Sequence, residues 1–151
     1  METGLQRFLD AQSEGYALAL SEIRQGMKRS HWIWYIFPQI KDLGFSYNSE
    51  YYGISSLQEA RDYLNHEVLG KRLQEITASL LLHRGKDIEL IMGDIDAVKL
   101  KSSMTLFDAI QPGDIFGEVL DEFYSGERCR RTLELLGRNV RGILSYTISI
   151  Y

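Results

Sequence analysis

The sequence has few of the residues that cross-link or interrupt a chain. Its 151 residues include one cysteine, Cys129, and two prolines, Pro38 and Pro112. A single cysteine excludes an internal disulfide, and a chain of this length can bury roughly 68 to 70 per cent of its surface without one. There is no proline-rich or glycine-rich linker and no repeat of solenoid period, so we predict one domain.

Long apolar runs are also missing. The longest, such as Leu80-Leu81-Leu82, fall far short of the roughly 20 residues that a bilayer-spanning helix needs. The first residues include an acid, Glu2, and do not show the basic start and apolar run of a signal peptide. We therefore expect no membrane association and a cytoplasmic location.

Positive charge is not in excess. The chain carries 17 basic and 21 acidic side chains, a net charge of −4, which argues against binding to duplex nucleic acid. The three histidines lack the spacing of a helical metal motif and only one cysteine could assist them, so no metal is expected. The glycines are too scattered for a phosphate-binding loop, and no cofactor is predicted.

The apolar residues that are present recur at helical spacing and predict an all-α domain of about eight helices. Ser56 with Glu59 forms a capping-box pattern, and Asp87 and Asp114 are further candidate caps. A helix starting near Ser30 should end by residue 36 or 37, because Pro38 disfavours helical geometry before it. The remaining helices are expected at 5–11, 14–23, 57–64, 66–82, 87–93, 94–110, 115–124 and 131–136, and residues 39–56 are expected to form a loop.

The last residues differ in character. We assign residues 1–138 to the helical domain and residues 139–151 to a C-terminal extension that is rich in strand-favouring side chains. A lone strand has no partner in an all-α domain, so the extension either packs irregularly or mediates self-association.

The most informative segment is the aromatic block at 31–39. In a helix, His31 would lie beside Trp34 and Tyr35, where a purine or nicotinamide ring could stack while His31 and Gln39 donate or accept hydrogen bonds. The plainer interpretation assigns much of the block to the hydrophobic core, namely Trp32, Ile33, Ile36 and Phe37.

A second group lies on the helix expected at 94–110. Asp96, Lys99 and Ser103 follow one another at i, i+3 and i+7, with Ser102 on an adjoining face. The lysine could neutralise a phosphate and the hydroxyls could add hydrogen bonds, or serine and lysine could form a catalytic pair. A serine that bonds back into its own helix is the commoner case.

Residues 45–53 contain three tyrosines among hydroxyl and amide side chains, a composition suited to recognising a polar ligand. They could form the wall opposite the aromatic block, with Lys28 and Lys99 supplying charge. No catalytic residue is identified. The candidate ligand-binding residues are Gln12, Lys28, His31, Trp34, Gln39, Ser46, Tyr52, Lys99, Ser102 and Ser103.

Three motifs carry a family resemblance: FLDAQ at 8–12, SHWIWYIFPQI at 30–40 and KLKSSMTLF at 99–107. In this order they resemble the bacterial domain-of-unknown-function family 1810, over about residues 4–137. The resemblance implies a compact all-α fold and no established activity. Glu67 departs from the pattern, since family members usually have proline there.

These observations support three hypotheses. The first is a small-molecule binding domain that sequesters a nucleotide-derived ligand, ADP-ribose-like or a cyclic nucleotide. The second is a hydrolase for a similar ligand, with His31 or Lys99 transferring protons. The third is a protein-interaction module or homo-oligomer that uses the extension and the tyrosine-rich segment. The pocket of the first two hypotheses exists only if the aromatic block and the Lys99 helix lie side by side.

Overall fold

The computed structural model describes residues 4–140, which form nine α-helices and one 3₁₀ turn with no strand. The predicted all-α fold is confirmed. The extended tail that we predicted lies outside the described residues, apart from its first two positions. The elements are α1 (Gln6–Gln25), α2 (Ile33–Ile36), α3 (Tyr47–Tyr52), α4 (Leu57–Asn65), α5 (Leu69–Leu80), η1 (Leu81–His83), α6 (Ile88–Met92), α7 (Asp94–Ile110), α8 (Ile115–Tyr124) and α9 (Arg130–Val140).

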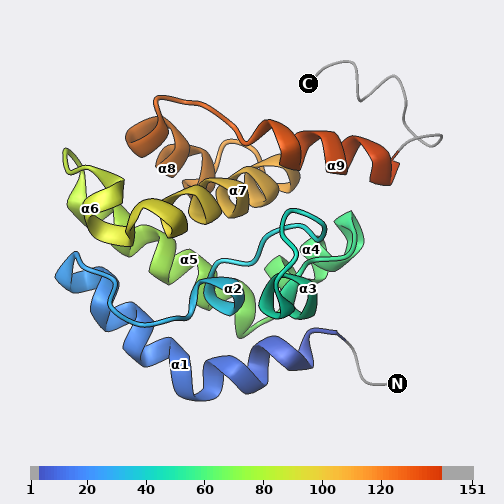
Figure 1. Cartoon of the computed structure of the whole chain (residues 1–151), viewed down its shortest axis with the longest axis horizontal. Helices are drawn as coiled ribbons and strands as arrows, with labels where there is room; N and C mark the ends of the chain where they lie inside the picture. The colour runs from blue at the N-terminus through green and yellow to red at the C-terminus, as the bar shows by residue number, and fades with distance from the viewer. Residues whose placement is uncertain (1–3, 141–151) are drawn as a thin grey trace.

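The long helices are stacked across the molecule. In Figure 1, α1 lies along the lower edge, α8 and α9 along the upper edge, and α5 and α7 between them. Helix α1 packs on α5 and α2, while α7 packs on α4, α6, α8 and α9. Within the described part of the chain, no helix is both long and apolar enough to cross a bilayer.

A line of aromatic rings runs through the core and joins four helices. Phe8 of α1 meets Tyr63 of α4 edge-on with ring centroids 5.0 Å apart. Tyr63 then lies 5.6 Å from Phe107 of α7, which lies 5.7 Å from Phe116 of α8. All four rings are buried. Such rings carry much of the burial energy of a small core, so this line fixes α7 relative to α1.

The predicted helix caps are confirmed. The Ser56 hydroxyl accepts a hydrogen bond from the Glu59 amide at 3.1 Å. Asp87 Oδ1 accepts the Glu89 amide at the start of α6 at 2.8 Å, and Asp114 Oδ1 accepts the Ile115 amide at the start of α8 at 2.6 Å. His66 Nδ1 accepts the amides of Val68 and Leu69 before α5. Each cap satisfies a backbone N–H that has no partner within its helix.

Three predicted boundaries are wrong. The helices expected at 5–11 and 14–23 are one helix, because core residues on both sides hold α1 together across Gly15, which lies directly against the Tyr35 ring. The loop expected at 39–56 contains α3, capped by Ser46 through the Ser49 amide. The helix expected at 131–136 is longer, because α9 continues past Gly137 to Val140. Gly15 and Gly137 do not end their helices, because a single glycine lowers the stability of a helix by only about 1 kcal/mol.

Candidate functional site

The aromatic block divides between the core and the surface. Trp32, Ile33, Ile36 and Phe37 are buried, which confirms the plainer interpretation for these four residues. Trp34 and Tyr35, within the single turn α2, are partly exposed. Tyr35 turns toward α1 and lies 5.6 Å from the Tyr52 ring, whereas Trp34 turns toward α7. The expectation that His31 lies beside both rings is therefore wrong for Tyr35, because α2 begins only after His31.

A buried carboxylate fixes the start of the block. Glu22 Oε1 accepts hydrogen bonds from the amides of Arg29 and Ser30 and from Trp32 Nε1, at 2.8, 3.0 and 2.9 Å. Its Oε2 accepts the Ser30 hydroxyl at 2.6 Å. Burial alone would raise the pKa of Glu22, but these donors outweigh it and hold the pKa at about 2. The ionised carboxylate thus ties the loop before α2 to α1.

The first turns of α7 bring charge to the exposed ring of the block. Lys99 Nζ lies 4.7 Å from the centre of the Trp34 ring and 3.5 Å from Asp96 Oδ1. The second carboxylate oxygen of Asp96 pairs with Lys28 Nζ at 2.7 Å. One carboxylate therefore links the loop before α2 to α7, and the two groups predicted from the sequence lie side by side.

Two surface hollows meet at Lys99. The first, of about 510 Å³, is the His31 hollow and is lined by His31, Trp34, Met92, Gly93, Asp94, Ile95, Asp96 and Lys99. The second, of about 550 Å³, is the Arg131 hollow and is lined by Gln39, Leu43, Gly44, Ser49, Asp94, Ile95, Val98, Lys99, Ser102, Cys129 and Arg131. Because they share the first two turns of α7, we treat them as one α2–α7 groove.

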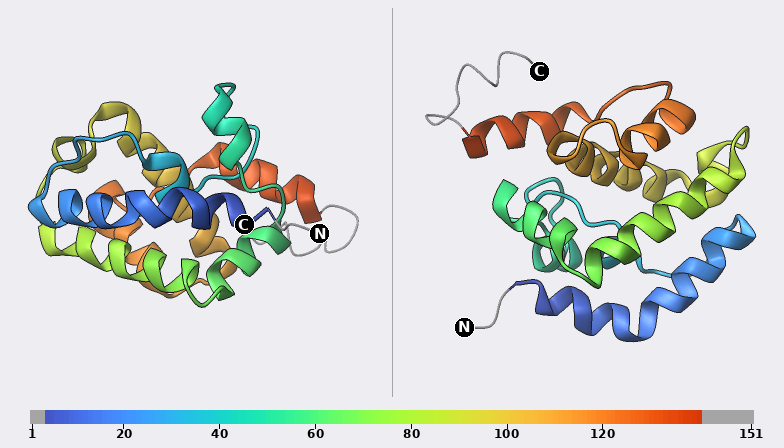
Figure 2. Two further views of the ribbon diagram at one scale, coloured as in Figure 1. Left: turned by 90° about the horizontal axis from the view of Figure 1, so that it is seen from below. Right: turned by 180° about the vertical axis from the view of Figure 1, so that it is seen from behind.

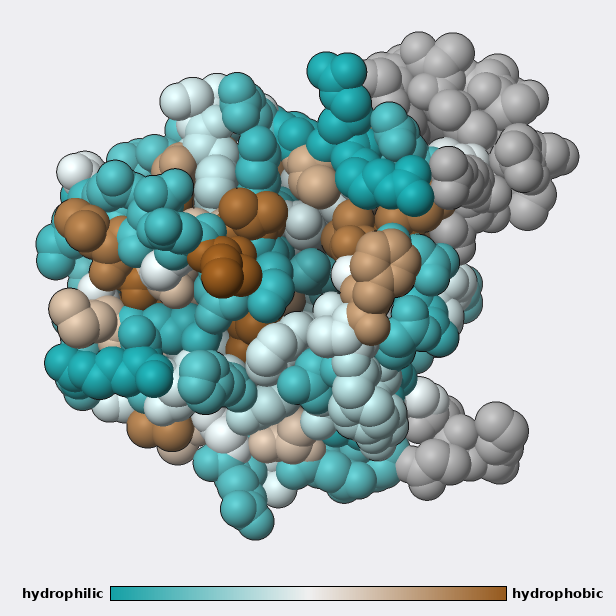
Figure 3. Space-filling model, viewed as in Figure 1, coloured by the Kyte–Doolittle hydropathy of each residue, from teal (hydrophilic) through white to brown (hydrophobic). Residues whose placement is uncertain are grey.

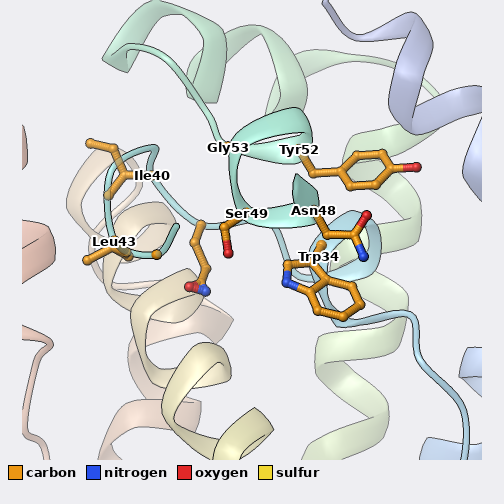
Figure 4. A pocket seen from close by; sticks show the side chains of 9 residues that line it. Trp34, Ile40, Leu43, Asn48, Ser49, Tyr52 and Gly53 are labelled. Carbon is orange, nitrogen blue, oxygen red and sulfur yellow. The ribbon is translucent and has the colours of Figure 1, made fainter. Parts of the chain in front are cut away.

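A smaller pocket opens beside this groove and is called here the Trp34 pocket. It has a volume of about 10 Å³, room for about one water molecule. Figure 4 shows Asn48 and Ser49 reaching from α3 toward Trp34, with the nitrogen-bearing edge of the indole facing Ser49. The buried Trp34 Nε1 has no hydrogen-bond partner among the described residues. A buried donor left unpaired is unfavourable, so this edge is a place for an acceptor from water or ligand.

Helix α3 belongs to a segment that projects from the body of the molecule (Figure 2). Residues 40 and 54 at its two ends form a parallel bridge, in which the Lys41 amide donates to Ile54 O and the Ile54 amide donates to Gln39 O, both at 2.8 Å. Arg7 of α1 donates to Tyr51 O at 2.7 Å and to Gly53 O at 2.9 Å. The segment is thus held at its base and forms the wall opposite α7.

The rim of the groove is apolar. Ile95 and Val98 of α7 are 72% and 64% exposed, and Phe45, which precedes α3 in the opposite wall, is 94% exposed. Figure 3 shows apolar side chains gathered over α6 and α7 on this face, among polar ones. Exposed apolar side chains around a polar hollow are typical of a binding surface.

Six of the ten candidate residues line the groove or its pocket: His31, Trp34, Gln39, Tyr52, Lys99 and Ser102. Tyr52 reaches only the Trp34 pocket. The Ser102 hydroxyl donates back to Val98 O at 3.3 Å, the commoner case for a helical serine, and Ser102 still lines the Arg131 hollow. Ser103 does not follow this case, because its buried hydroxyl has no hydrogen-bond partner among the described residues.

The other four candidates lie outside the groove. Gln12 is buried in the core, where it donates to Tyr35 O and to the Tyr63 hydroxyl. The Lys28 side chain is only 5% exposed and is committed to Asp96. Ser46 caps α3, and Ser103 faces the interior with no exposure. None of these four side chains lines the groove, because helical spacing gives the angle between residues but not the direction of the core.

Sequence reasoning missed several lining residues, namely Asn48, Ser49, Cys129 and Arg131. The signal for the first two was available, since Ser46 followed by Ser49 is a helix-start pattern that would have replaced the expected loop. Cys129 lies directly before the first residue of α9, and its Sγ accepts a hydrogen bond from the Ser102 hydroxyl at 3.4 Å. Burial raises the pKa of the Cys129 thiol, but hydrogen bonds from Ser102 and the start of α9 lower it overall.

Within residues 4–140, no three side chains of the metal-binding types gather in one place. The polar groups that line the groove are an indole, an imidazole, carboxamides, hydroxyls, a thiol, the two cations Lys99 and Arg131, and the two carboxylates Asp94 and Asp96. Such a set is suited to a ligand with both an aromatic ring and an anionic group.

Comparison with known proteins agrees with this fold. The crystal structure of the conserved hypothetical protein Rv1873 from Mycobacterium tuberculosis is 46% identical and superposes with a TM-score of 0.82, over 87% of this chain and 95% of that one. No curated protein matches the sequence. Residues 2–136 match the family described as a protein of unknown function, DUF1810. The chain therefore belongs to the DUF1810 family.

Proposed function

We propose that this protein binds a nucleotide-derived small molecule in the α2–α7 groove and acts in the cytoplasm by sequestering it. The ligand class is ADP-ribose-like or a cyclic nucleotide. The observation that carries the proposal is the pairing of a partly exposed aromatic ring with a lysine ammonium, Trp34 with Lys99, at 4.7 Å in one groove. The base of a nucleotide can stack on the Trp34 ring, and its phosphate can pair with the Lys99 ammonium.

The rest of the groove suits the same ligand. A base stacked on Trp34 in the His31 hollow has the imidazole at its edge, and its phosphate reaches the Arg131 hollow, where Lys99 and Arg131 lie. The side-chain amide of Gln39 can donate to or accept from a ribose hydroxyl. Asp96 does not repel the phosphate strongly, because Lys28 neutralises it at 2.7 Å.

Isothermal titration calorimetry with AMP, cyclic AMP, ADP and ADP-ribose tests the proposal. We expect at least one of them to bind, and Trp34→Ala to weaken it by about tenfold or more, the effect of losing one stacking platform. Tyr47→Ala is the matched control, because Tyr47 is a 75% exposed aromatic side chain that lines none of these hollows. No binding of any member at millimolar concentration would refute the proposal.

Sequestration and hydrolysis are separated by what becomes of the ligand. After incubation with the bound nucleotide, the protein is denatured by heat and the released material is analysed by chromatography. Sequestration predicts quantitative recovery of the intact nucleotide. Recovery of cleaved products in excess over the protein would show turnover and replace sequestration by catalysis.

A further inference from the structure

Lys99 covers the aromatic face that the proposed ligand would use. Its Nζ lies 4.7 Å from the Trp34 ring centre, and its side chain remains 25% exposed. A cation over an indole is attracted to the ring, so a ring that enters the His31 hollow must displace it. In the free protein, Trp34 is thus occupied by a side chain of its own groove.

Lys99 can also leave its second contact, the ion pair with Asp96, at a low energetic cost. Asp96 lies 3.5 Å from Lys99 but 2.7 Å from Lys28, whose side chain is 5% exposed. When Lys99 moves away, Asp96 keeps its closer and better buried partner. The departure of Lys99 therefore leaves no carboxylate unpaired. An unpaired, partly buried carboxylate would be strongly unfavourable.

Trp32 and Lys28 show what a permanent pair of this kind looks like. Lys28 Nζ also lies 4.7 Å from an indole centre, that of Trp32. Trp32, however, is 1% exposed and donates its N–H to Glu22. The same distance thus describes a buried structural pair in one case and an accessible, replaceable one in the other.

A destination for the Lys99 ammonium exists next to Trp34. Lys99 lines the Arg131 hollow as well as the His31 hollow, and its flexible four-carbon stem can turn between them. Among the residues that the structure describes, Arg131 forms an ion pair only with the exposed Glu134, at 3.3 Å. An anion in the Arg131 hollow would therefore draw Lys99 toward it and uncover Trp34 in the same movement.

We infer that Lys99 is a specificity-determining residue that selects ligands carrying an anionic group and rejects the same aromatic ring without one. A nucleotide replaces the Lys99–Trp34 contact with a lysine–phosphate contact and a base–Trp34 stack. A nucleoside gains the stack but leaves the ammonium without the ring or a phosphate. This inference rests on the proposed function and adds the requirement for phosphate.

Two nucleotide–nucleoside pairs, AMP with adenosine and GMP with guanosine, test the inference by calorimetry on the full chain. In the wild type we expect the nucleotide to bind more tightly than its nucleoside by about thirtyfold, as one charge-assisted contact allows. In Lys99→Ala we expect the nucleotide to weaken by about tenfold and the nucleoside to bind about threefold more tightly, because the competing cation–π contact is gone. The two affinities converge by movement in opposite directions.

Lys99→Gln, which keeps a long polar side chain without the charge, should show the same convergence. Lys101→Ala is the matched control, because Lys101 lies two residues away over the Tyr124 ring at 5.9 Å and pairs with Glu127 outside the groove. It should leave both affinities unchanged. Near-ultraviolet circular dichroism of each variant checks that the fold is intact.

The outcomes separate the inference from the proposed function. If Lys99→Ala weakens nucleotide and nucleoside by the same factor, or changes neither, the inference is wrong although the groove still binds nucleotides. If the wild type binds the nucleotide no more tightly than its nucleoside, the inference is also wrong, because Lys99 then does not select for an anionic group. If none of AMP, GMP, adenosine and guanosine binds the wild type or either Lys99 variant, the inference is wrong. The proposed function fails as well only if cyclic AMP, ADP and ADP-ribose also do not bind.

Discussion

The two walls of the groove are built in different ways. Eight residues of α7 are buried, and the helix packs on α4, α6, α8 and α9. Helix α3, in the opposite wall, has no buried residue and packs mainly on α2. It is held by the bridge between Ile40 and Ile54 and by hydrogen bonds from Arg7.

This difference assigns separate tasks to the walls. The charged group that we expect to meet a phosphate, Lys99, stands on the wall that the core fixes. Asn48 and Ser49, which can adjust their hydrogen bonds to a ligand, stand on the wall that few contacts fix. Local opening free energies follow such contact density, so the α3 wall should open more readily than the α7 wall.

The largest expected effect breaks the α7 wall. Leu100 has no exposure and lies one residue after Lys99, so Leu100→Ala leaves a cavity beneath the groove. We expect the free energy of unfolding to fall by about 3 to 4 kcal/mol, measured by urea denaturation. Phe45→Ala, on the opposite wall, removes a side chain that is 94% exposed and should change it by less than about 0.5 kcal/mol. Equal losses would show that the walls do not differ as described.

The second prediction concerns the attachment of α2, which lies between the walls. The pKa of Glu22 is held at about 2, below its ordinary 4.5. A carboxylate with a lowered pKa stabilises the fold fully above its unfolded-state pKa, and this stabilisation is lost as pH falls from 4.5 toward 2. We expect a loss of about 2 to 3 kcal/mol over that window in the wild type.

Glu22→Gln separates the pH-dependent stabilisation by Glu22 from that of the other acidic residues, because the glutamine side chain does not titrate. The difference in unfolding free energy between wild type and variant, measured by urea denaturation at pH 2 to 7, should shrink as the solution becomes acidic. A difference that is constant across this range would contradict the proposed role of the carboxylate.

Much of the fold could be predicted because it depends on local patterns. The caps at Ser56, Asp87 and Asp114 satisfy backbone groups within a few residues, so the sequence displays them directly. The continuity of α1 could not be predicted in this way. Its middle is polar and contains Gly15, and only packing against Tyr35, 20 positions along the chain, shows why the helix persists.

The candidate site was predicted in part for a similar reason. His31, Trp34, Gln39 and Lys99 stand out by chemistry, and the fold brings them to one groove. Ser102 and Ser103 are adjacent and chemically identical, yet only Ser102 lines it. Which serine faces the core depends on how α7 is rotated against α4 and α8, and that rotation is set by residues distant in the sequence.

The smallest expected effect loosens the α3 wall and leaves the α7 wall intact. Arg7→Ala removes the donors to Tyr51 O and Gly53 O, and also the ion-pair partner of Glu59 in α4, 3.0 Å away. We expect a loss of global stability of about 1 to 2 kcal/mol and amide exchange in α3 that is faster by tenfold or more relative to α7, measured by hydrogen exchange. Arg24→Ala is the control, because Arg24 is also on α1 but forms an exposed pair with Glu75 at 3.6 Å. Uniform acceleration in both walls would mean that Arg7 supports the whole fold, and the contrast between the walls would then not depend on it.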